Sequence, residues 1–142
     1  MMGTRDQQLV ACAMLDSKQL RMSEDSRIQA EDHYYAALDH FAEGRYEAAI
    51  EEYRQALAVD PNFTDAMHGL ARVLQDLERY DEAIELAKKL AEINSEDILA
   101  HTSLSILYQK KGMIPEAEAE ANKARVLGWK KQLLDQKAQQ KR

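Results

Sequence analysis

The sequence predicts an all-α fold built from stacked helical hairpins. In 142 residues, glycine occurs five times and proline twice, so residues that break helices are rare. Apolar residues recur at intervals of three and four, which is the period of an amphipathic helix and not of a strand. A short segment also recurs at a spacing of 34 residues. A fixed period of this length is typical of a solenoid, in which each unit packs on its neighbours.

The repeat is visible in three copies in one register. Residues 45–51 recur as residues 79–85 and, more weakly, as residues 113–119. These copies place the repeats at 30–63, 64–97 and 98–131 without insertion or deletion. Residues 1–29 then form an N-terminal helical extension, and residues 132–142 form a basic C-terminal capping helix or tail. The length fits one domain and is too short for two independent ones.

Each repeat is expected to hold two helices. The first helices are placed at 30–42, 64–76 and 98–110, and the second helices at 46–59, 80–93 and 114–127. Gly44 and Gly112 fall in the turns inside repeats one and three, where a positive φ ends a helix cheaply. Pro115 fits the first turn of a helix. Ser95, which is followed by acidic residues, is expected to be the N-cap of the helix at 98–110.

This framework resembles the tetratricopeptide repeat. The small residue that lets the two helices of a repeat approach is matched by Ala49, Ala83 and Ala117, and the bulky residue four positions after the first of them by Tyr53. Repeats one and two match well in their second helices, whereas repeat three is degenerate. The resemblance implies a right-handed solenoid of helical hairpins that binds another polypeptide in a concave groove lined by the first helices. His33, Met67 and His101 stand where the family often has tryptophan.

The resemblance also implies which side chains would line that groove. Carried over position by position, they give an apolar, polar, apolar pattern along the three repeats. Some family members grip a C-terminal carboxylate, but here the matching positions hold no such clamp. The expected partner-binding residues are Tyr34, Leu38, Phe41, His68, Arg72, Gln75, Leu99, Thr102, Ile106 and Gln109.

Alternatives to an open groove follow from the flanking segments. The stripe of Tyr34, Leu38 and Phe41 is not expected to be needed for the core of its repeat, so either a partner or the N-terminal segment could cover it. That segment carries apolar residues at helical spacing, and a cap, a separate docking helix and partial disorder all remain open for it. A second function is therefore a structural or assembly subunit, or a self-associating scaffold, using the N-terminal helix or the convex surface. The apolar residues of the N-terminal segment are Leu9, Val10, Ala13 and Leu20.

Other features argue for packing and against recognition. Arg72 and Asp76 are expected to pair on the surface of one helix. Tyr46 and Tyr80 occupy equivalent repeat positions and are expected to pack between helices. His33 and His101 are also equivalent, which favours packing or groove lining. No histidine pair has the spacing of a metal site, so no metal or cofactor is expected.

The charge pattern and the motifs exclude several functions. Residues 30–127 carry ten basic and twenty acidic residues, whereas residues 128–142 carry five basic and one acidic. An acidic body argues against nucleic-acid binding, although the basic tail could act as an electrostatic anchor. No nucleophile, phosphate-binding or catalytic motif appears, so the chain is expected not to be an enzyme. A single cysteine, Cys12, and no apolar run that could span a bilayer predict a cytoplasmic protein.

Overall fold

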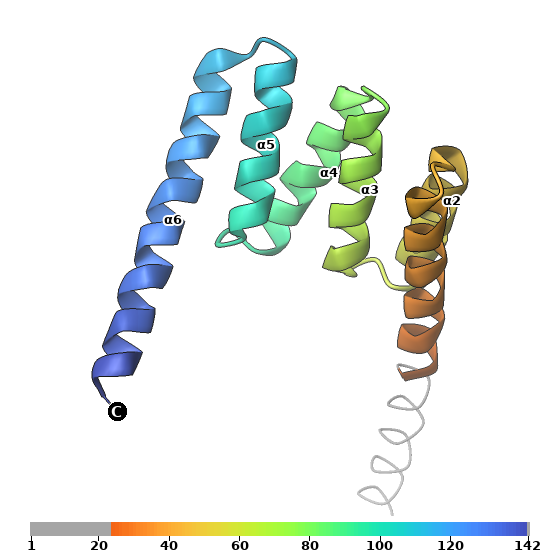
Figure 1. Ribbon diagram of the computed structural model, residues 1–142, viewed down its shortest axis with the longest axis horizontal. Coiled ribbons are helices and arrows are strands. Elements are labelled where there is room, and N and C mark those ends of the chain that lie inside the picture. The colour runs from red at the N-terminus through yellow and green to blue at the C-terminus, as the bar shows by residue number, and fades with distance from the viewer. Residues whose placement is uncertain (1–23, 142) are drawn as a thin grey trace, which may run out of the picture.

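The computed structural model describes residues 24–141, and every regular element in this range is an α-helix (Figure 1). The first helix covers residues 24–42. Consecutive helices from α2 onward pack on one another in chain order, which produces a row of helices and not a closed bundle. The predicted all-α helical-hairpin solenoid is thereby confirmed. The helices that follow the first are α2 (Tyr46–Val59), α3 (Thr64–Asp76), α4 (Tyr80–Ile93), α5 (Ile98–Lys110) and α6 (Ile114–Gln140).

The bounds of the two terminal helices differ from the expectation. The first helix is already present at residue 24, six positions before the predicted repeat. Helix α6 runs without a break to Gln140, so the predicted C-terminal cap is a continuation of the last repeat helix. Lysine, glutamine and leucine dominate the sequence after Trp129, and their helix propensity explains why the helix does not stop. The predictions for Leu9, Val10, Ala13 and Leu20 lie outside the described residues.

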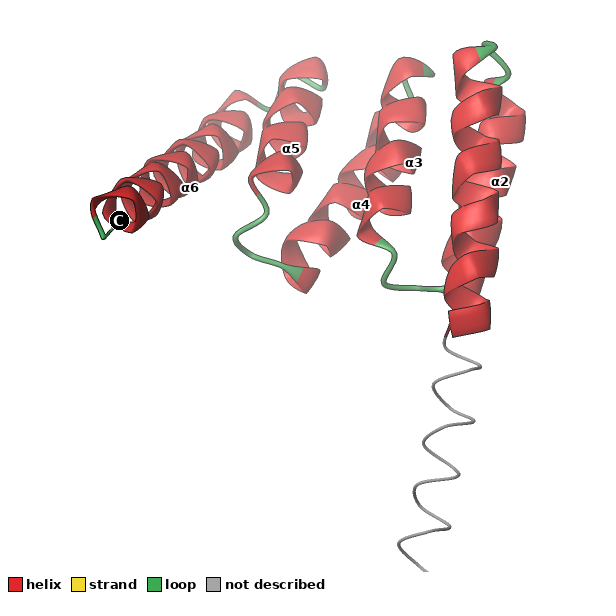
Figure 2. Cartoon of the chain, turned by 60° about the horizontal axis from the view of Figure 1, so that its bottom comes forward, coloured by secondary structure: helices red, strands yellow, loops and turns green. Residues whose placement is uncertain are grey.

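The turns inside the three repeats share one backbone geometry, and these short loops lie at the ends of the helices (Figure 2). Gly44 and Gly112 have a φ of 79°, as their predicted role requires, and Glu78 at the equivalent position has a φ of 61°. No sequence pattern points to Glu78, because glutamate rarely adopts a left-handed conformation. Each turn is closed by a 2.8 Å hydrogen bond from a backbone amide to a carbonyl five residues earlier, as in a Schellman motif. These bonds run from Arg45 to His40, from Arg79 to Leu74 and from Met113 to Tyr108.

The N-cap of α5 is Asp97, so the prediction of Ser95 is wrong. The Asp97 side chain accepts a hydrogen bond from the backbone amide of Ala100, with a donor-to-acceptor distance of 3.3 Å. Ser95 lies too early in the chain, because the backbone first makes a turn in which Asn94 Oδ1 accepts from the Glu96 amide at 3.0 Å. The chain enters α5 only after that turn.

Small residues and one large aromatic ring hold the repeats together. Ala49 and Ala83 are completely buried and Ala117 nearly so, as the repeat pattern predicts. Tyr53 is the largest fully buried side chain among residues 24–141, and a Cβ at Gly69 of α3 would lie only 2.5 Å from its ring. Burial, with a smaller contribution from Tyr34, raises the pKa of Tyr53 to about 12. Gly69 therefore allows α3 to approach the Tyr53 ring of α2.

Tyr46 and Tyr80 pack against the core, as predicted. Both side chains are partly buried against the main hydrophobic cluster. The rings of Tyr46 and Phe41 lie 5.6 Å apart between their centroids. The equivalence of the two tyrosines thus reflects packing at the start of α2 and α4.

Candidate functional site

The candidate site is the surface formed by the predicted partner-binding residues on the first helix of each repeat, namely the 24–42 helix, α3 and α5. We call it the first-helix surface. Three of its apolar side chains are exposed: Leu38, Leu99 and Ile106. Leu99 is the most open of them, with 63% of its surface accessible. Apolar side chains at the two ends of the first-helix surface are thus free to contact another molecule.

Two predicted groove residues of the first repeat are committed to packing. The Tyr34 ring lies 6.1 Å from that of Tyr53 and 5.3 Å from that of Phe63, between centroids. Phe41 packs on Tyr46, and Tyr34 and Phe41 are both half-buried against the core cluster. The expectation that this stripe is independent of the core of its repeat is therefore wrong for both residues. Leu38 is the member of the stripe that stays exposed.

The environment of Tyr34 also disfavours its ionised form. Burial raises the pKa of the Tyr34 hydroxyl, and the negative charge of Asp65 adds to this effect. Tyr34 is therefore a neutral aromatic side chain at the edge of the first-helix surface.

The middle of the first-helix surface is polar. Arg72 Nε lies 3.4 Å from Asp76 Oδ1 within α3, which is the surface pair that the sequence predicts. His68 is half-buried, and its Nε2 lies 2.9 Å from Asp97 Oδ2. Since Asp97 also caps α5, its carboxylate joins α3 to α5. His68 therefore links two repeats, whereas Arg72 is exposed and Gln75 is half-buried.

The third repeat contributes Leu99, Thr102, Ile106 and Gln109, all of which are exposed. The Thr102 hydroxyl donates to the Ile98 carbonyl at 2.8 Å, so its polar group is used inside α5. This leaves the apolar pair of Leu99 and Ile106 as the prominent feature of α5. The exposed predicted residues are thus Leu38 in the first repeat, the polar Arg72 in the second, and chiefly the apolar Leu99 and Ile106 in the third.

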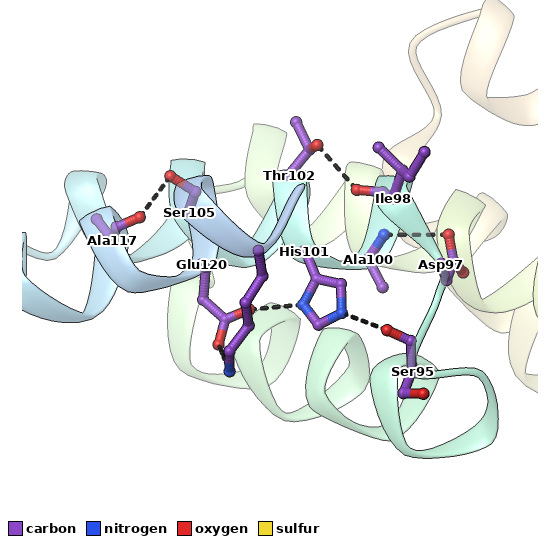
Figure 3. A network of polar contacts seen from close by, with 10 residues as sticks. Ser95, Asp97, Ile98, Ala100, His101, Thr102, Ser105, Ala117 and Glu120 are labelled. Atoms are coloured by element: carbon purple, nitrogen blue, oxygen red, sulfur yellow. Dashed lines mark hydrogen bonds and ion pairs between the residues drawn. The ribbon is translucent and has the colours of Figure 1, made fainter. Parts of the chain in front are cut away.

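Two histidines anchor the hairpins through contacts that the sequence did not predict. In Figure 3, His101 of α5 points between Glu120 of α6 and the backbone of Ser95. Its Nδ1 lies 2.7 Å from Glu120 Oε2, and its Nε2 lies 2.8 Å from the Ser95 carbonyl oxygen. Both partners are acceptors, so the two hydrogen bonds form together only when both ring nitrogens carry hydrogen.

The same contact occurs in the first repeat but not in the second. His33 Nδ1 lies 2.7 Å from Glu52 Oε2, again 19 residues along the chain. At the equivalent positions of the middle repeat, Met67 is buried and Leu86 packs against its cluster. Equivalent positions of the three hairpins thus hold a polar pair in the two outer repeats and an apolar pair in the middle repeat. The signal in the sequence was the shared offset of 19 residues, which only the hairpin geometry makes meaningful.

Glu120 is held in its charged form by its neighbours. Burial raises the pKa of Glu120, but hydrogen bonds and positive charge from His101 and Lys123 outweigh it and keep the pKa below its ordinary range.

Within residues 24–141, no three histidine, cysteine or acidic side chains gather as a metal site would require. No helix in this range is long and apolar enough to cross a membrane.

Two hollows in the described part of the chain lie away from the first-helix surface. One of about 630 Å³ is bounded by α4 together with Arg54, Leu70 and Leu74. Another of about 510 Å³ is bounded by α6 together with Ser95 and His101. The walls of the first hollow mix basic and acidic side chains, and those of the second are mainly apolar. Neither is bounded by the predicted partner-binding residues.

The fold and the exposed first-helix surface define a helical-repeat solenoid, a class generally used for protein interaction without catalysis. Residues 40–107 match the family model described as tetratricopeptide repeat. Over these 68 of the 142 residues, the chain is therefore similar to the tetratricopeptide repeat family. No curated protein sequence matches the chain.

Solved structures of similar fold include three kinds of protein. A crystal structure of MamA is 30% identical with a TM-score of 0.70, and the match covers 72% of this chain and 60% of that chain. The second TPR of Spaghetti (RPAP3), bound to HSP90 peptide SRMEEVD, is 21% identical with a TM-score of 0.72, covering 79% and 96%. The translocator chaperone SycD of Yersinia enterocolitica is 23% identical with a TM-score of 0.66, covering 69% and 73%. The chain spans about three fifths of the MamA structures that it matches.

Proposed function

We propose that this chain is a non-catalytic protein-interaction module that binds a partner polypeptide on its first-helix surface. The observation that carries the proposal is the exposure of Leu38 at one end of that surface and of Leu99 and Ile106 at the other. Exposed apolar side chains flanking a polar centre are typical of a peptide-binding surface. An adaptor or scaffold in the cytoplasm is the role that suits such a module.

The chemistry of the surface indicates what the partner looks like. Two apolar anchors on the partner would contact Leu38 and the pair of Leu99 and Ile106, and polar groups between them would face Arg72 and Gln75. The positions that form a carboxylate clamp in some relatives hold Tyr34, Leu38, Gly69, Leu99 and Ser103 here. We therefore expect an internal segment of the partner, and not a free C-terminus. Peptides bound to Spaghetti and to SycD, the latter from the translocator YopD, support peptide binding by this fold.

Random linear peptides displayed on phage are a suitable probe, because the fold does not specify the sequence of the partner. We expect peptides with two apolar anchors to be enriched on the purified chain. Leu38→Glu and Ile106→Glu should each lower the affinity for the enriched peptides by about tenfold or more, because each places a charge against an apolar anchor. Fluorescence anisotropy with the labelled peptides measures the change in affinity.

The control is Ile93→Glu, which adds the same charge at a similarly exposed apolar position of α4. It should leave peptide affinity at the wild-type value. If enriched peptides bind both first-helix variants as tightly as the wild type, the first-helix surface is not the binding site.

A further inference from the structure

The 24–42 helix carries an exposed stripe in which apolar and acidic residues alternate. The stripe consists of Ile28, Asp32, Tyr35 and Asp39, and we call it the acidic end face. Ile28 is 55% exposed and Tyr35 is 59% exposed, although both are large and apolar in most of their surface. The spacing of four, three and four residues places the stripe on one side of the helix, opposite the buried Ala30.

Helix α6 carries a stripe of the same spacing and the opposite charge. It consists of Val126, Lys130, Leu133 and Lys137, and we call it the basic end face. Val126 is 57% exposed and Leu133 is 59% exposed, and the exposed Trp129 lies beside them. Apolar and charged residues alternate in the same order as on the acidic end face. Each stripe extends roughly 16 Å along its helix, given a rise of about 1.5 Å per residue.

The two faces belong to helices at opposite ends of the row of helices (Figure 1). The helix at 24–42 has five acidic residues and one basic residue, whereas residues 128–141 have four basic residues and one acidic residue. The end units of a solenoid normally present polar outer faces, because nothing packs on them. Here the first and the last helix both combine polar groups with large exposed apolar side chains.

We propose that the acidic end face of one copy of this chain docks on the basic end face of a second copy. Apolar contacts then form between Ile28 and Tyr35 of one copy and Val126 and Leu133 of the other. Asp32 and Asp39 lie near Lys130 and Lys137, so that opposite charges alternate with the apolar contacts. The solenoid continues from one molecule into the next.

Charge decides between this arrangement and a symmetric one. Pairing two basic end faces would bring lysines opposite lysines, and pairing two acidic end faces would bring aspartates together, which is unfavourable in both cases. A second copy supplies the complementary face with the same spacing. Because the two surfaces differ, the contact is head-to-tail and leaves a free face at each end of the assembly.

The docking uses none of the residues that carry the proposed peptide-binding function. Leu38, Leu99 and Ile106 lie outside both end faces, so each proposal can fail without the other. Lys130 Nζ also lies 2.6 Å from Glu96 Oε1, and hydrogen bonding to Lys130 holds the pKa of Glu96 below its ordinary range. This pair is exposed, so replacing Lys130 has little effect on folding.

Sedimentation velocity of the full chain over a series of concentrations tests the docking. The weight-average mass should rise above the 16.2 kDa of one chain as concentration increases. It should return toward one chain as salt approaches about 1 M, where the Debye length is about 3 Å. The variants Asp32→Lys with Asp39→Lys, and Lys130→Glu with Lys137→Glu, should each remain monomeric, because each has end faces of one sign.

An equimolar mixture of the two charge-reversed variants should associate again, since it restores opposite charges at every junction. Glu51→Lys with Glu92→Lys makes the same change in net charge as Asp32→Lys with Asp39→Lys, but away from both faces, and should associate as the wild type does. Thermal melting tests whether each variant is folded. If a double variant does not fold, the single substitutions Asp39→Lys and Lys137→Glu replace it and should each weaken the association. A monomeric wild type, a reversed variant that associates normally, or a mixture that stays monomeric would each overturn the proposal.

Discussion

Glu78 has the same left-handed backbone as Gly44 and Gly112, although a side chain disfavours that conformation. Glu78→Gly should therefore raise the free energy of unfolding by roughly 1 kcal/mol, after subtraction of the greater freedom of glycine in the unfolded chain. Urea denaturation followed by circular dichroism measures the change.

The matched variant is Gly112→Ala, which introduces at the equivalent turn the strain that Glu78→Gly removes. It should lower the free energy of unfolding by about 1 kcal/mol. Equal stability of Glu78→Gly and the wild type would show that the turn of the middle repeat is not strained at this residue.

The pair of His101 and Glu120 makes stability depend on pH in the acidic range. The pKa of Glu120 is lower in the folded chain than its ordinary value of 4.5, so its charged form stabilises the fold. That contribution is complete above about pH 5 and is lost as the pH falls through the lowered pKa. Glu120→Gln should thus reduce stability at neutral pH, and its difference from the wild type should shrink below the ordinary pKa.

Denaturation curves at several pH values between neutral and acidic conditions measure this difference. Glu118→Gln provides the comparison, because it makes the same chemical change at an exposed position of the same helix. A difference between the Glu120→Gln variant and the wild type that stays constant on acidification would contradict the role of the charged pair.

At the scale of helices, two glycines inside helices have opposite surroundings. A Cβ at Gly69 of α3 would collide with the Tyr53 ring at 2.5 Å, whereas nothing lies within 4 Å of a Cβ at Gly128 of α6. Tyr53 is 1% exposed, so its ring has little room to move aside. Gly69→Ala should therefore lower the free energy of unfolding by roughly 1 kcal/mol or more, because overpacking exceeds the gain in helix propensity.

Gly128→Ala should instead raise the free energy of unfolding by up to about 1 kcal/mol, since only helix propensity changes there. Thermal melting of the two variants side by side gives the signs directly. A stabilising Gly69→Ala would mean that α2 and α3 do not approach as closely as the Tyr53 contact requires.

At the scale of the molecule, we expect the backbone amides to be unevenly protected from hydrogen exchange along the row of helices. The middle repeat packs on both sides, whereas residues 129–140 of α6 are exposed all round. Hydrogen exchange followed by mass spectrometry should show slow exchange in α3 and α4 and fast exchange in residues 129–140 at low protein concentration. Slow exchange of this end of α6 at the lowest concentrations would show that another part of the chain covers it.

The repeat period allowed much of the fold to be predicted because it is a local pattern that recurs. Period and turn residues together placed α2, α3, α4 and α5, and the alanines of the second helices lie in the core as expected. The candidate site was less predictable. Exposure decides which side chains can meet a partner, and the packing of Tyr34 and Phe41 depends on residues far along the chain.

The sequence by itself determined the repeat length, the helical pairs and the separation of an acidic body from a basic tail. Tertiary structure alone decided that Asp97 caps α5 while binding His68, that histidines and glutamates 19 residues apart meet, and that opposite ends of the row expose matching stripes. The physical reason is the separation of the interacting residues along the chain. Helix formation and turns depend on neighbouring residues, whereas these contacts and exposures depend on how the hairpins stack.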